Sequence, residues 1–167
     1  DTDRIQGISN EKLLSRDYNL SNIYAAIHMA FSRRMRPEEQ IASSIDFSAH
    51  LFYKLRKNKV NNIIYLSSAG VYGNHIGIRT EKTPPAPNSL YSMAKYAAEK
   101  VFDAYFEELK DVNRTCLRLG SVIQSQNLVQ ALCKQAKQEG VLRLIGGKQE
   151  FTYIDVEDAV GAIAKLL

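Results

Sequence analysis

The 167-residue chain contains no tryptophan, only two cysteines and four prolines, and no run of 18 apolar residues. Without such a run we expect no membrane-spanning helix, because about 20 apolar residues are needed to cross a bilayer. Residues 1–4 lack the apolar stretch of a signal peptide. Cys116 and Cys133 have no close cysteine partners, which argues against a disulfide framework or a cysteine-based metal site. We therefore expect a cytoplasmic protein without a metal.

The charge balance is only mildly basic. The sequence has 22 Lys and Arg against 18 Asp and Glu, a net charge of +4. No dense basic stripe with interleaved aromatic residues is present, so a nucleic-acid partner is not expected. The tightest basic cluster is Arg33, Arg34 and Arg36. It is either a solvated loop at the entry to a helix or an anion-binding group.

Short apolar runs alternate with longer amphipathic runs along the chain. The pattern predicts strands at 24–29, 62–67, 114–119, 141–145 and 151–154, and helices at 37–57, 90–109, 127–138 and 156–167. Such alternation is typical of βαβ units and a parallel sheet covered on both faces. Ligands bind these sheets at the carboxyl ends of the strands. We therefore searched the polar residues that follow the apolar runs, at 28–32, 67–73 and 120–125.

One pair of residues there suggests proton-transfer chemistry. Tyr91 and Lys95 are four residues apart, so a phenol and an ammonium share one helix face. A tyrosine with a pKa near 10 is a poor base at neutral pH, but a nearby ammonium favours the phenolate and lowers that pKa. Proton exchange with an alcohol then becomes feasible. Ser67 and Ser68, at the end of a predicted strand, offer the hydroxyl that must hold the reacting oxygen.

Spacing alone does not identify this pair. Three tyrosines have a lysine four residues later: Tyr53–Lys57, Tyr91–Lys95 and Tyr96–Lys100. Tyr53 precedes the serine-ended strand, and Tyr96 is rotated by roughly 140° from Tyr91 on the helix. Only Tyr91 opens a helix after the long loop at 73–88, with Ser89 as the expected N-cap.

Two segments together resemble a known family. Residues 66–73 read L-S-S-A-G-V-Y-G, and residues 84–95 read P-P-A-P-N-S-L-Y-S-M-A-K. They resemble the S-(S/T)-x-x-V-Y-G motif, proline-rich loop and Y-x-x-x-K motif of the extended short-chain dehydrogenase/reductase family, in its NAD-dependent epimerase/dehydratase group. Residues 26–30, 118–122 and 153–160 also resemble, in order, the family's V-I-H-L-A, R-P-G-N-V and F-V-H-V-D-D-V-A segments.

This resemblance implies roles for the central residues. Tyr91 would be the catalytic proton-transfer residue. Lys95 would lower its pKa and, together with Tyr91, contact the cofactor at the nicotinamide ribose. Ser68 would be the catalytic hydroxyl that orients the substrate oxygen. Ser67 is either a further cofactor contact or a structural residue whose hydroxyl is tied to a neighbouring strand.

The resemblance also implies outer contacts. His28 and Ala30 would line the cofactor channel, although a lone histidine at a strand end is also typical of a satisfied structural residue. Gly120 and Ser121 would lie near the nicotinamide, and Ser121 would also touch the substrate. Gly120 is alternatively a turn residue that needs a positive φ. Arg33 would supply positive charge to the substrate.

The sequence departs from the family at several points. The G-x-x-G-x-x-G loop, whose backbone and helix N-terminus hold the pyrophosphate, is absent from these 167 residues. Phe151 stands where nucleotide-sugar members carry an arginine, and Ser121 where they carry an asparagine. Ala69 and Gly70 stand where family dehydratases often carry acidic residues, which argues against dehydration.

We therefore expect an α/β fold with a doubly wound, Rossmann-like parallel sheet that lacks the first βαβ unit and most of the C-terminal substrate lobe. Residues 1–167 would form a partial NAD(P)-binding domain, with residues 120–155 leading into the substrate lobe. The chain would be the visible or cloned part of a longer enzyme, or alternatively a natural short paralogue.

The implied function is that of an NAD(P)-dependent epimerase/dehydratase or reductase. Its substrate would be a nucleotide-sugar or a related hydroxyl or carbonyl compound, its cofactor NAD or NADP, and its assembly a homodimer. The alternative is a non-catalytic dinucleotide-binding or scaffold paralogue that lacks the glycine-rich loop.

Overall fold

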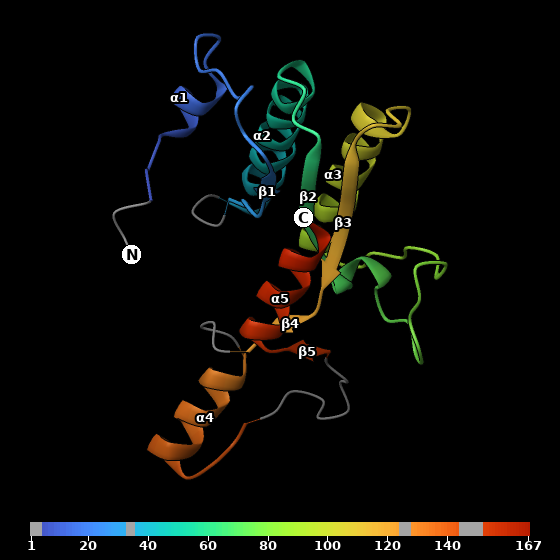
Figure 1. Cartoon of the computed structure of the whole chain (residues 1–167). Coiled ribbons are helices and arrows are strands. Elements are labelled where there is room, and N and C mark those ends of the chain that lie inside the picture. The colour runs from blue at the N-terminus through green and yellow to red at the C-terminus, as the bar shows by residue number, and fades with distance from the viewer. Residues whose placement is uncertain (1–4, 33–35, 124–127, 144–151) are drawn as a thin grey trace.

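The computed structural model describes residues 5–32, 36–123, 128–143 and 152–167 (Figure 1). In chain order the elements are α1 (Asn10–Leu14), β1 (Ala26–His28), α2 (Pro37–Lys57), β2 (Asn62–Ser68), the 3₁₀ turn η2 (Ala69–Tyr72), α3 (Leu90–Phe106), β3 (Asn113–Leu119), β4 (Ser121–Val122), α4 (Leu128–Glu139), β5 (Tyr153–Ile154) and α5 (Val156–Leu166).

Strands β1, β2 and β3 form one parallel sheet in that order. Ile27 of β1 pairs with Ile64 of β2, and Tyr65 of β2 pairs with Cys116 of β3. Residues 63–65 of β2 are all buried, as expected for a central strand that is covered on both faces. The predicted α/β class and parallel, Rossmann-like sheet are confirmed.

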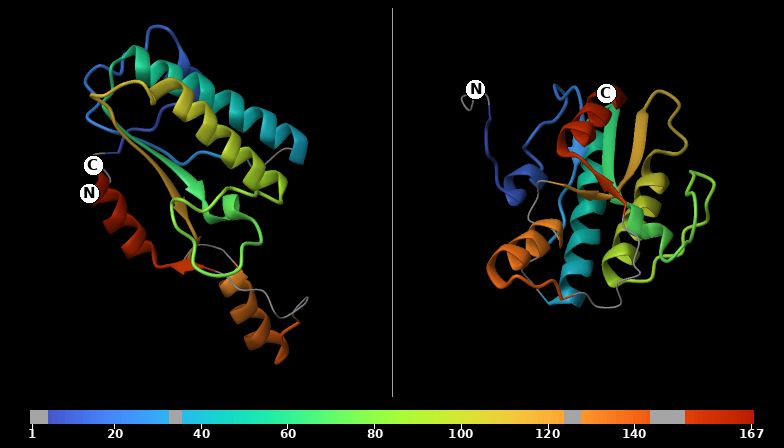
Figure 2. Two further views of the ribbon diagram at one scale, coloured as in Figure 1. Left: turned by 90° about the vertical axis from the view of Figure 1, so that its right-hand side faces the viewer. Right: turned by 90° about the horizontal axis from the view of Figure 1, so that it is seen from below.

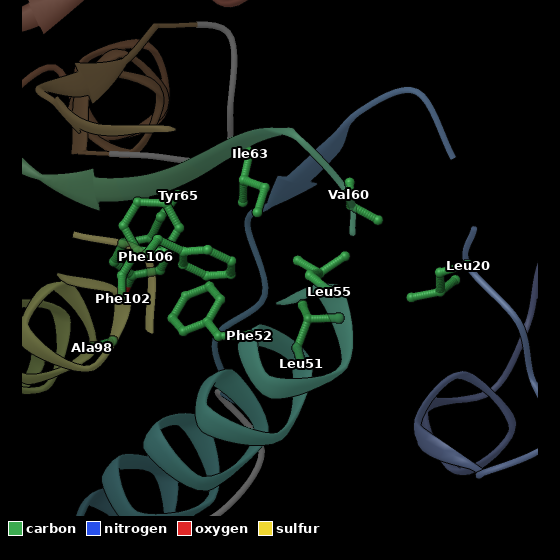
Figure 3. Packing of buried hydrophobic residues seen from close by; sticks show 10 residues of the cluster. All are labelled: Leu20, Leu51, Phe52, Leu55, Val60, Ile63, Tyr65, Ala98, Phe102 and Phe106. Atoms are coloured by element: carbon green, nitrogen blue, oxygen red, sulfur yellow. The ribbon is translucent and has the colours of Figure 1, made fainter. Parts of the chain in front are cut away.

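Helices α2 and α3 cover one face of this sheet, and α5 runs along the opposite face (Figure 2). The core lies between β2 and the two helices, where aromatic rings from three elements meet (Figure 3). The ring of Phe52 lies 5.0 Å from that of Phe102 and 5.8 Å from that of Tyr65, centroid to centroid. This packing fixes the angle at which α3 crosses the sheet, and α3 carries the candidate catalytic pair.

The C-terminal end of α5 is tied to the amino ends of the strands. The side-chain amide of Asn113 donates a hydrogen bond to the carbonyl oxygen of Leu166 (2.9 Å), and the Tyr24 hydroxyl donates one to that of Leu167 (3.0 Å). The helix therefore points its N-terminus toward the carboxyl end of the sheet.

Local signals explain where the two long helices begin. Pro37 occupies the first turn of α2, where its missing N–H costs nothing. The Ser89 hydroxyl accepts a hydrogen bond from the backbone N–H of Ser92, and the Ser92 hydroxyl accepts one from that of Ser89, so the two serines cap α3 reciprocally. Both helix starts were predicted from the sequence.

The strand predicted at 141–145 is wrong for the three residues that the structure describes there. Residues 141–143 are irregular and follow Gly140, which ends α4 with a φ of 66°. No strand of the described part of the chain lies beside them, and a strand without a ladder partner is not stable. The short strand β5 pairs in parallel with β4, a strand that was not predicted.

Two helices also differ from the sequence predictions. The short helix α1 was not predicted, and α3 ends at Phe106, three residues before its expected end. No helix among the described residues is long and apolar enough to span a bilayer.

Candidate active site

Tyr91 and Lys95 lie on the same side of the first turns of α3, at the carboxyl end of the sheet. The Lys95 Nζ atom is 5.9 Å from the centroid of the Tyr91 ring. It donates a hydrogen bond of 2.8 Å to the carbonyl oxygen of Leu66, near the end of β2. This bond connects the start of α3 to the strand that ends in the two serines.

The Lys95 ammonium is buried among aromatic rings, and its side chain is only 3% exposed. Besides Tyr91, its Nζ atom lies 5.1 Å from the ring centroid of Tyr65 and 5.6 Å from that of Phe31. Burying a charge is costly unless polar groups replace the water it loses. Here the Leu66 carbonyl and the faces of the rings supply that stabilisation.

Tyr91 lies at the rim of this buried group, with 37% of its surface exposed. Its ring meets the ring of Phe31 edge to face, with centroids 4.8 Å apart. A cavity of about 320 Å³ adjoins the two rings and is also lined by Pro37, Gln40, Ile41 and Leu90. The tyrosine is thus accessible to a ligand, whereas the lysine beside it is not exposed to bulk water.

The two serines at the end of β2 differ in their surroundings. Ser68 is half-buried, and its hydroxyl accepts a hydrogen bond of 3.1 Å from the backbone N–H of Gly70. A Cβ atom on Gly70 would lie 3.3 Å from the Ser68 hydroxyl and 3.4 Å from the Ser92 Cβ atom. The Ser68 hydroxyl therefore lies close to Ser92 in the first turn of α3, the turn that also carries Tyr91.

Ser67 is buried, and its hydroxyl has no hydrogen-bond partner among the described residues. Of the two alternatives for Ser67, the structural one needs a hydrogen bond to a neighbouring strand, and the described residues provide none. A buried hydroxyl without a partner is destabilising. A bound ligand that accepts a hydrogen bond from Ser67, or donates one to it, would remove this cost.

His28 is a buried residue at the end of β1, with 3% of its surface exposed. Its Nε2 atom lies 2.8 Å from the hydroxyl oxygen of Ser48. The Ser48 hydroxyl donates a hydrogen bond to the carbonyl of Ser44, so its oxygen accepts one from Nε2–H of His28, which assigns the Nε2–H tautomer. Burial, and secondly the positive charge of Lys95, lower the pKa of His28 to about 4.

A buried ion pair holds α3 to β3. The Arg118 guanidinium donates two hydrogen bonds, of 2.9 and 2.6 Å, to the carboxylate of Glu99, one turn after Lys95. The Arg118 guanidinium also stacks 4.7 Å from the ring centroid of Tyr72. The hydrogen bonds that Arg118 donates to Glu99 are the main cause that raises the pKa of Arg118, so the guanidinium stays charged.

The outer residues predicted from the family are more scattered. Ala30 and Ser121 are exposed, and the Ser121 backbone N–H donates to the Thr152 carbonyl (2.8 Å). Gly120 is not among the described glycines with positive φ. A Cβ atom there would lie 2.5 Å from the Thr152 carbonyl oxygen, so close backbone approach requires this glycine. Arg33 lies outside the described residues.

Sequence reasoning missed three features near the site. Phe31 follows the β1 strand and contacts both members of the candidate pair, Tyr91 and Lys95. Glu99 is a carboxylate in an apolar helix segment, four residues after Lys95, and this spacing places it on the same buried helix face. Arg79 reaches Thr152 Oγ1 from the long loop (3.2 Å), and its Nε atom is buried with no hydrogen-bond partner within the described ranges.

A second, larger cavity of about 780 Å³ lies along β3. It is lined by Tyr72, Arg79, Arg118, Gly120 and Thr152, among others. No cluster of three or more potential metal ligands is found among the residues that the structure describes.

A model of the NAD dependent epimerase/dehydratase family matches residues 7–167 of the chain. No curated protein sequence matches the chain. Many solved structures are similar to it. One is a "novel NAD dependent-NDP-hexosamine 5,6-dehydratase, TunA, involved in tunicamycin biosynthesis". It is 21% identical with a TM-score of 0.79, over 93% of this chain and 55% of that one.

Two other similar structures contain bound ligands. UDP-glucuronic acid 4-epimerase from Bacillus cereus, in complex with NAD, is 20% identical with a TM-score of 0.78, over 96% of this chain and 53% of that one. MoeE5, in complex with UDP-glucose and NAD, is 25% identical and has a TM-score of 0.72. The match covers 87% of this chain and 52% of MoeE5. The chain spans just over half the length of these three structures.

The buried His28 makes the stability of the fold sensitive to acid. Its folded pKa of about 4 lies below its ordinary value of 6.5. As the pH falls below about 6.5, the unfolded chain gains a proton that the folded chain does not. The free energy of unfolding should then drop by about 3 kcal/mol between pH 6.5 and 4 from this residue alone. Denaturant titrations across that range would measure the drop.

Carboxylates titrate in the same range, so the informative quantity is the difference between variants. His28→Gln keeps a donor for Ser48 but has no titratable ring, and it should lose most of the acid-dependent drop. His50→Gln, at an exposed histidine of α2, should keep the wild-type dependence. Equal slopes for His28→Gln and wild type would show that His28 is not held neutral.

Proposed function

Because the chain belongs to the NAD dependent epimerase/dehydratase family, we propose that Tyr91, Lys95 and Ser68 form the proton-transfer site of an NAD(P)-dependent enzyme. The observation that carries this proposal is the buried Lys95 ammonium beside the ring of Tyr91 (5.9 Å) at the carboxyl end of the sheet. A scaffold without chemistry gains nothing from burying an ammonium next to a solvent-accessible phenol, since the burial itself is costly.

The residues present fit the nicotinamide ribose end of NAD(P). Lys95 is a hydrogen-bond donor at the carboxyl end of β2, where its Nζ atom bonds the Leu66 carbonyl. The Ser67 hydroxyl, which has no hydrogen-bond partner among the described residues, offers another polar contact. Nothing in the sequence matches the loop that would hold the pyrophosphate, so the proposal concerns the nicotinamide half. The bound cofactor supplies a hydride acceptor or donor.

The three side chains divide the proton chemistry between them. Tyr91 takes the proton from a substrate hydroxyl, or returns it to a carbonyl oxygen, as the carbon beside it is oxidised or reduced. Lys95 stabilises the phenolate that forms on Tyr91 through its positive charge. Ser68 orients the reacting oxygen by a hydrogen bond. Together they let a tyrosine act as an acid and a base near neutral pH.

We assign the substrate to the nucleotide-sugars or to related hydroxyl or carbonyl compounds. Two of the similar structures support this class, since one is a UDP-glucuronic acid 4-epimerase and another holds UDP-glucose. The Ala69-Gly70 pair after Ser68 brings no carboxylate to the reacting carbon. It therefore favours an epimerase or a reductase over a dehydratase. We further propose that Arg33 supplies positive charge to the bound substrate.

The mechanism predicts a large and specific loss when the phenol is removed. In the full-length protein, Tyr91→Phe should lower turnover at least about a hundredfold, because general acid–base catalysis typically contributes that much or more. NADH binding, followed by its fluorescence, should persist. Tyr96→Phe, at the neighbouring Tyr-x-x-x-Lys pair, is the matched control and should keep normal turnover with the same panel of nucleotide-sugars.

Near-normal turnover in Tyr91→Phe would remove Tyr91 from the mechanism. A protein that binds NADH or NADPH but turns over no substrate would instead favour the binding-only alternative. A protein that binds neither would favour a scaffold.

We also propose that the protein is a cytoplasmic homodimer that joins through α2 and α3. Both helices present large apolar side chains to solvent on their outer surface, namely Tyr53, Leu90 and Met93. Both cysteines are free, as in a reducing compartment.

Sedimentation velocity tests this assembly. The wild-type protein should sediment with the mass of two chains, and Met93→Glu should shift it to one, because a buried carboxylate in an apolar interface is strongly unfavourable. Ile78→Glu, in an exposed loop, should leave the dimer intact. A wild-type monomer at micromolar concentration would exclude the dimer.

A further inference from the structure

The aromatic ring of Phe31 contacts both members of the catalytic pair. Phe31 lies just after β1, and its ring meets that of Tyr91 edge to face, with centroids 4.8 Å apart and an interplanar angle of 73°. The Lys95 Nζ atom lies 5.6 Å from the centroid of the same ring. One side chain from a different element thus bridges the phenol and the ammonium.

The chain is hydrogen-bonded to α2 on both sides of Phe31. Directly after it, the backbone N–H of Ser32 donates a hydrogen bond of 2.9 Å to the hydroxyl of Ser44. Three residues before it, the His28 ring is bonded to the hydroxyl of Ser48. Both α2 serines are buried and lie one helical turn apart. These two bonds hold the short loop that carries Phe31 against α2, and the Phe31 ring contacts Tyr91 of α3 from there.

We propose that Phe31 is a positioning residue, which keeps the ring of Tyr91 beside Lys95 and screens the ammonium from water. Tyr91 is partly exposed and lies in the first turn of α3, and the Phe31 ring contacts it from a different element. An edge-to-face contact between aromatic rings contributes about 0.5–1.5 kcal/mol beyond its burial, enough to favour one orientation. Its role in turnover rests on the proposed function.

Among the described residues of this cluster, Lys95 is the charged group beside the Tyr91 ring. The pKa of His28 is lowered to about 4, mainly by burial, so its ring is neutral near pH 7. Burial, and then the negative groups around it, raise the pKa of Tyr65, so this phenol is neutral too. Further along α3, the Glu99 carboxylate is engaged by Arg118. A change at Phe31 that moves Tyr91 relative to Lys95, or admits water between them, is therefore expected to shift the Tyr91 titration.

Removal of the ring should weaken the effect of Lys95 on Tyr91. Without Phe31, water enters beside Lys95 and raises the local dielectric constant, and the Tyr91 side chain gains freedom to turn away. Loss of phenol desolvation works in the opposite direction, but it is small because Tyr91 already contacts water. The net expectation is that the Tyr91 phenol ionises at a higher pH.

NMR of protein labelled at the tyrosine Cζ atoms tests this directly. The Tyr91 signal is assigned by its loss in Tyr91→Phe and is followed through a pH titration. Phe31→Ala should raise its midpoint by about one pH unit, the order of effect of a charge within 4–6 Å. Phe47→Ala, at a half-buried phenylalanine that packs on His28, is the matched control and should leave the midpoint unchanged.

Phe31→Leu keeps apolar bulk and guards against a folding defect in the alanine variant. It should shift the Tyr91 midpoint in the same direction by a smaller amount, and the alkaline or acidic limb of the pH–rate profile that reports Tyr91 should move with it. An unchanged midpoint in the folded Phe31 variants would overturn the proposal. Full turnover by Tyr91→Phe would instead contradict the proposed function and leave the titration result standing.

Discussion

The candidate site depends on one costly interaction, the burial of the Lys95 ammonium. Its bond to the Leu66 carbonyl connects α3 with β2, and three aromatic rings surround it. A buried charge requires fixed polar and aromatic neighbours, since any that move away leave it without stabilisation. The core packing of α3, the capped start of that helix and the Glu99–Arg118 pair all hold it in register with the sheet. In return, the ammonium lies beside a phenol that a ligand can reach.

Much of this arrangement was predictable from the sequence because it follows local rules. The continuous apolar run at 62–67 predicted a strand buried on both faces, and Pro37 and Ser89 marked the starts of α2 and α3. Once α3 begins at Leu90, helical geometry alone places Tyr91 and Lys95 on one face. The serine-ended strand, the proline-rich loop and the Tyr-x-x-x-Lys spacing then indicated a family, which the family match over residues 7–167 confirmed.

The features that were not predictable depend on contacts between distant segments. Residues 141–143 have strand-like composition, but none of the strands that the structure describes pairs with them. Strands β4 and β5 are too short to show a periodicity, and they form because they pair with each other. Gly120 is required by the approach of the Thr152 carbonyl and not by its own φ. Likewise, nothing in the sequence places Phe31 against Tyr91, because that contact is set by two serines of α2 that bind the end of β1.

The most direct test of the account is whether Lys95 contacts the cofactor. Binding of NADH and NADPH to the full-length protein can be measured by fluorescence titration for wild type, Lys95→Met and Lys100→Met. Hydrogen bonds to charged groups contribute about 1.5–3 kcal/mol, so Lys95→Met should weaken binding by about tenfold or more. Lys100→Met, at the exposed lysine of the neighbouring pair, should bind as wild type does. Equal affinities for wild type and Lys95→Met would contradict the assignment of this buried ammonium to a nicotinamide ribose site.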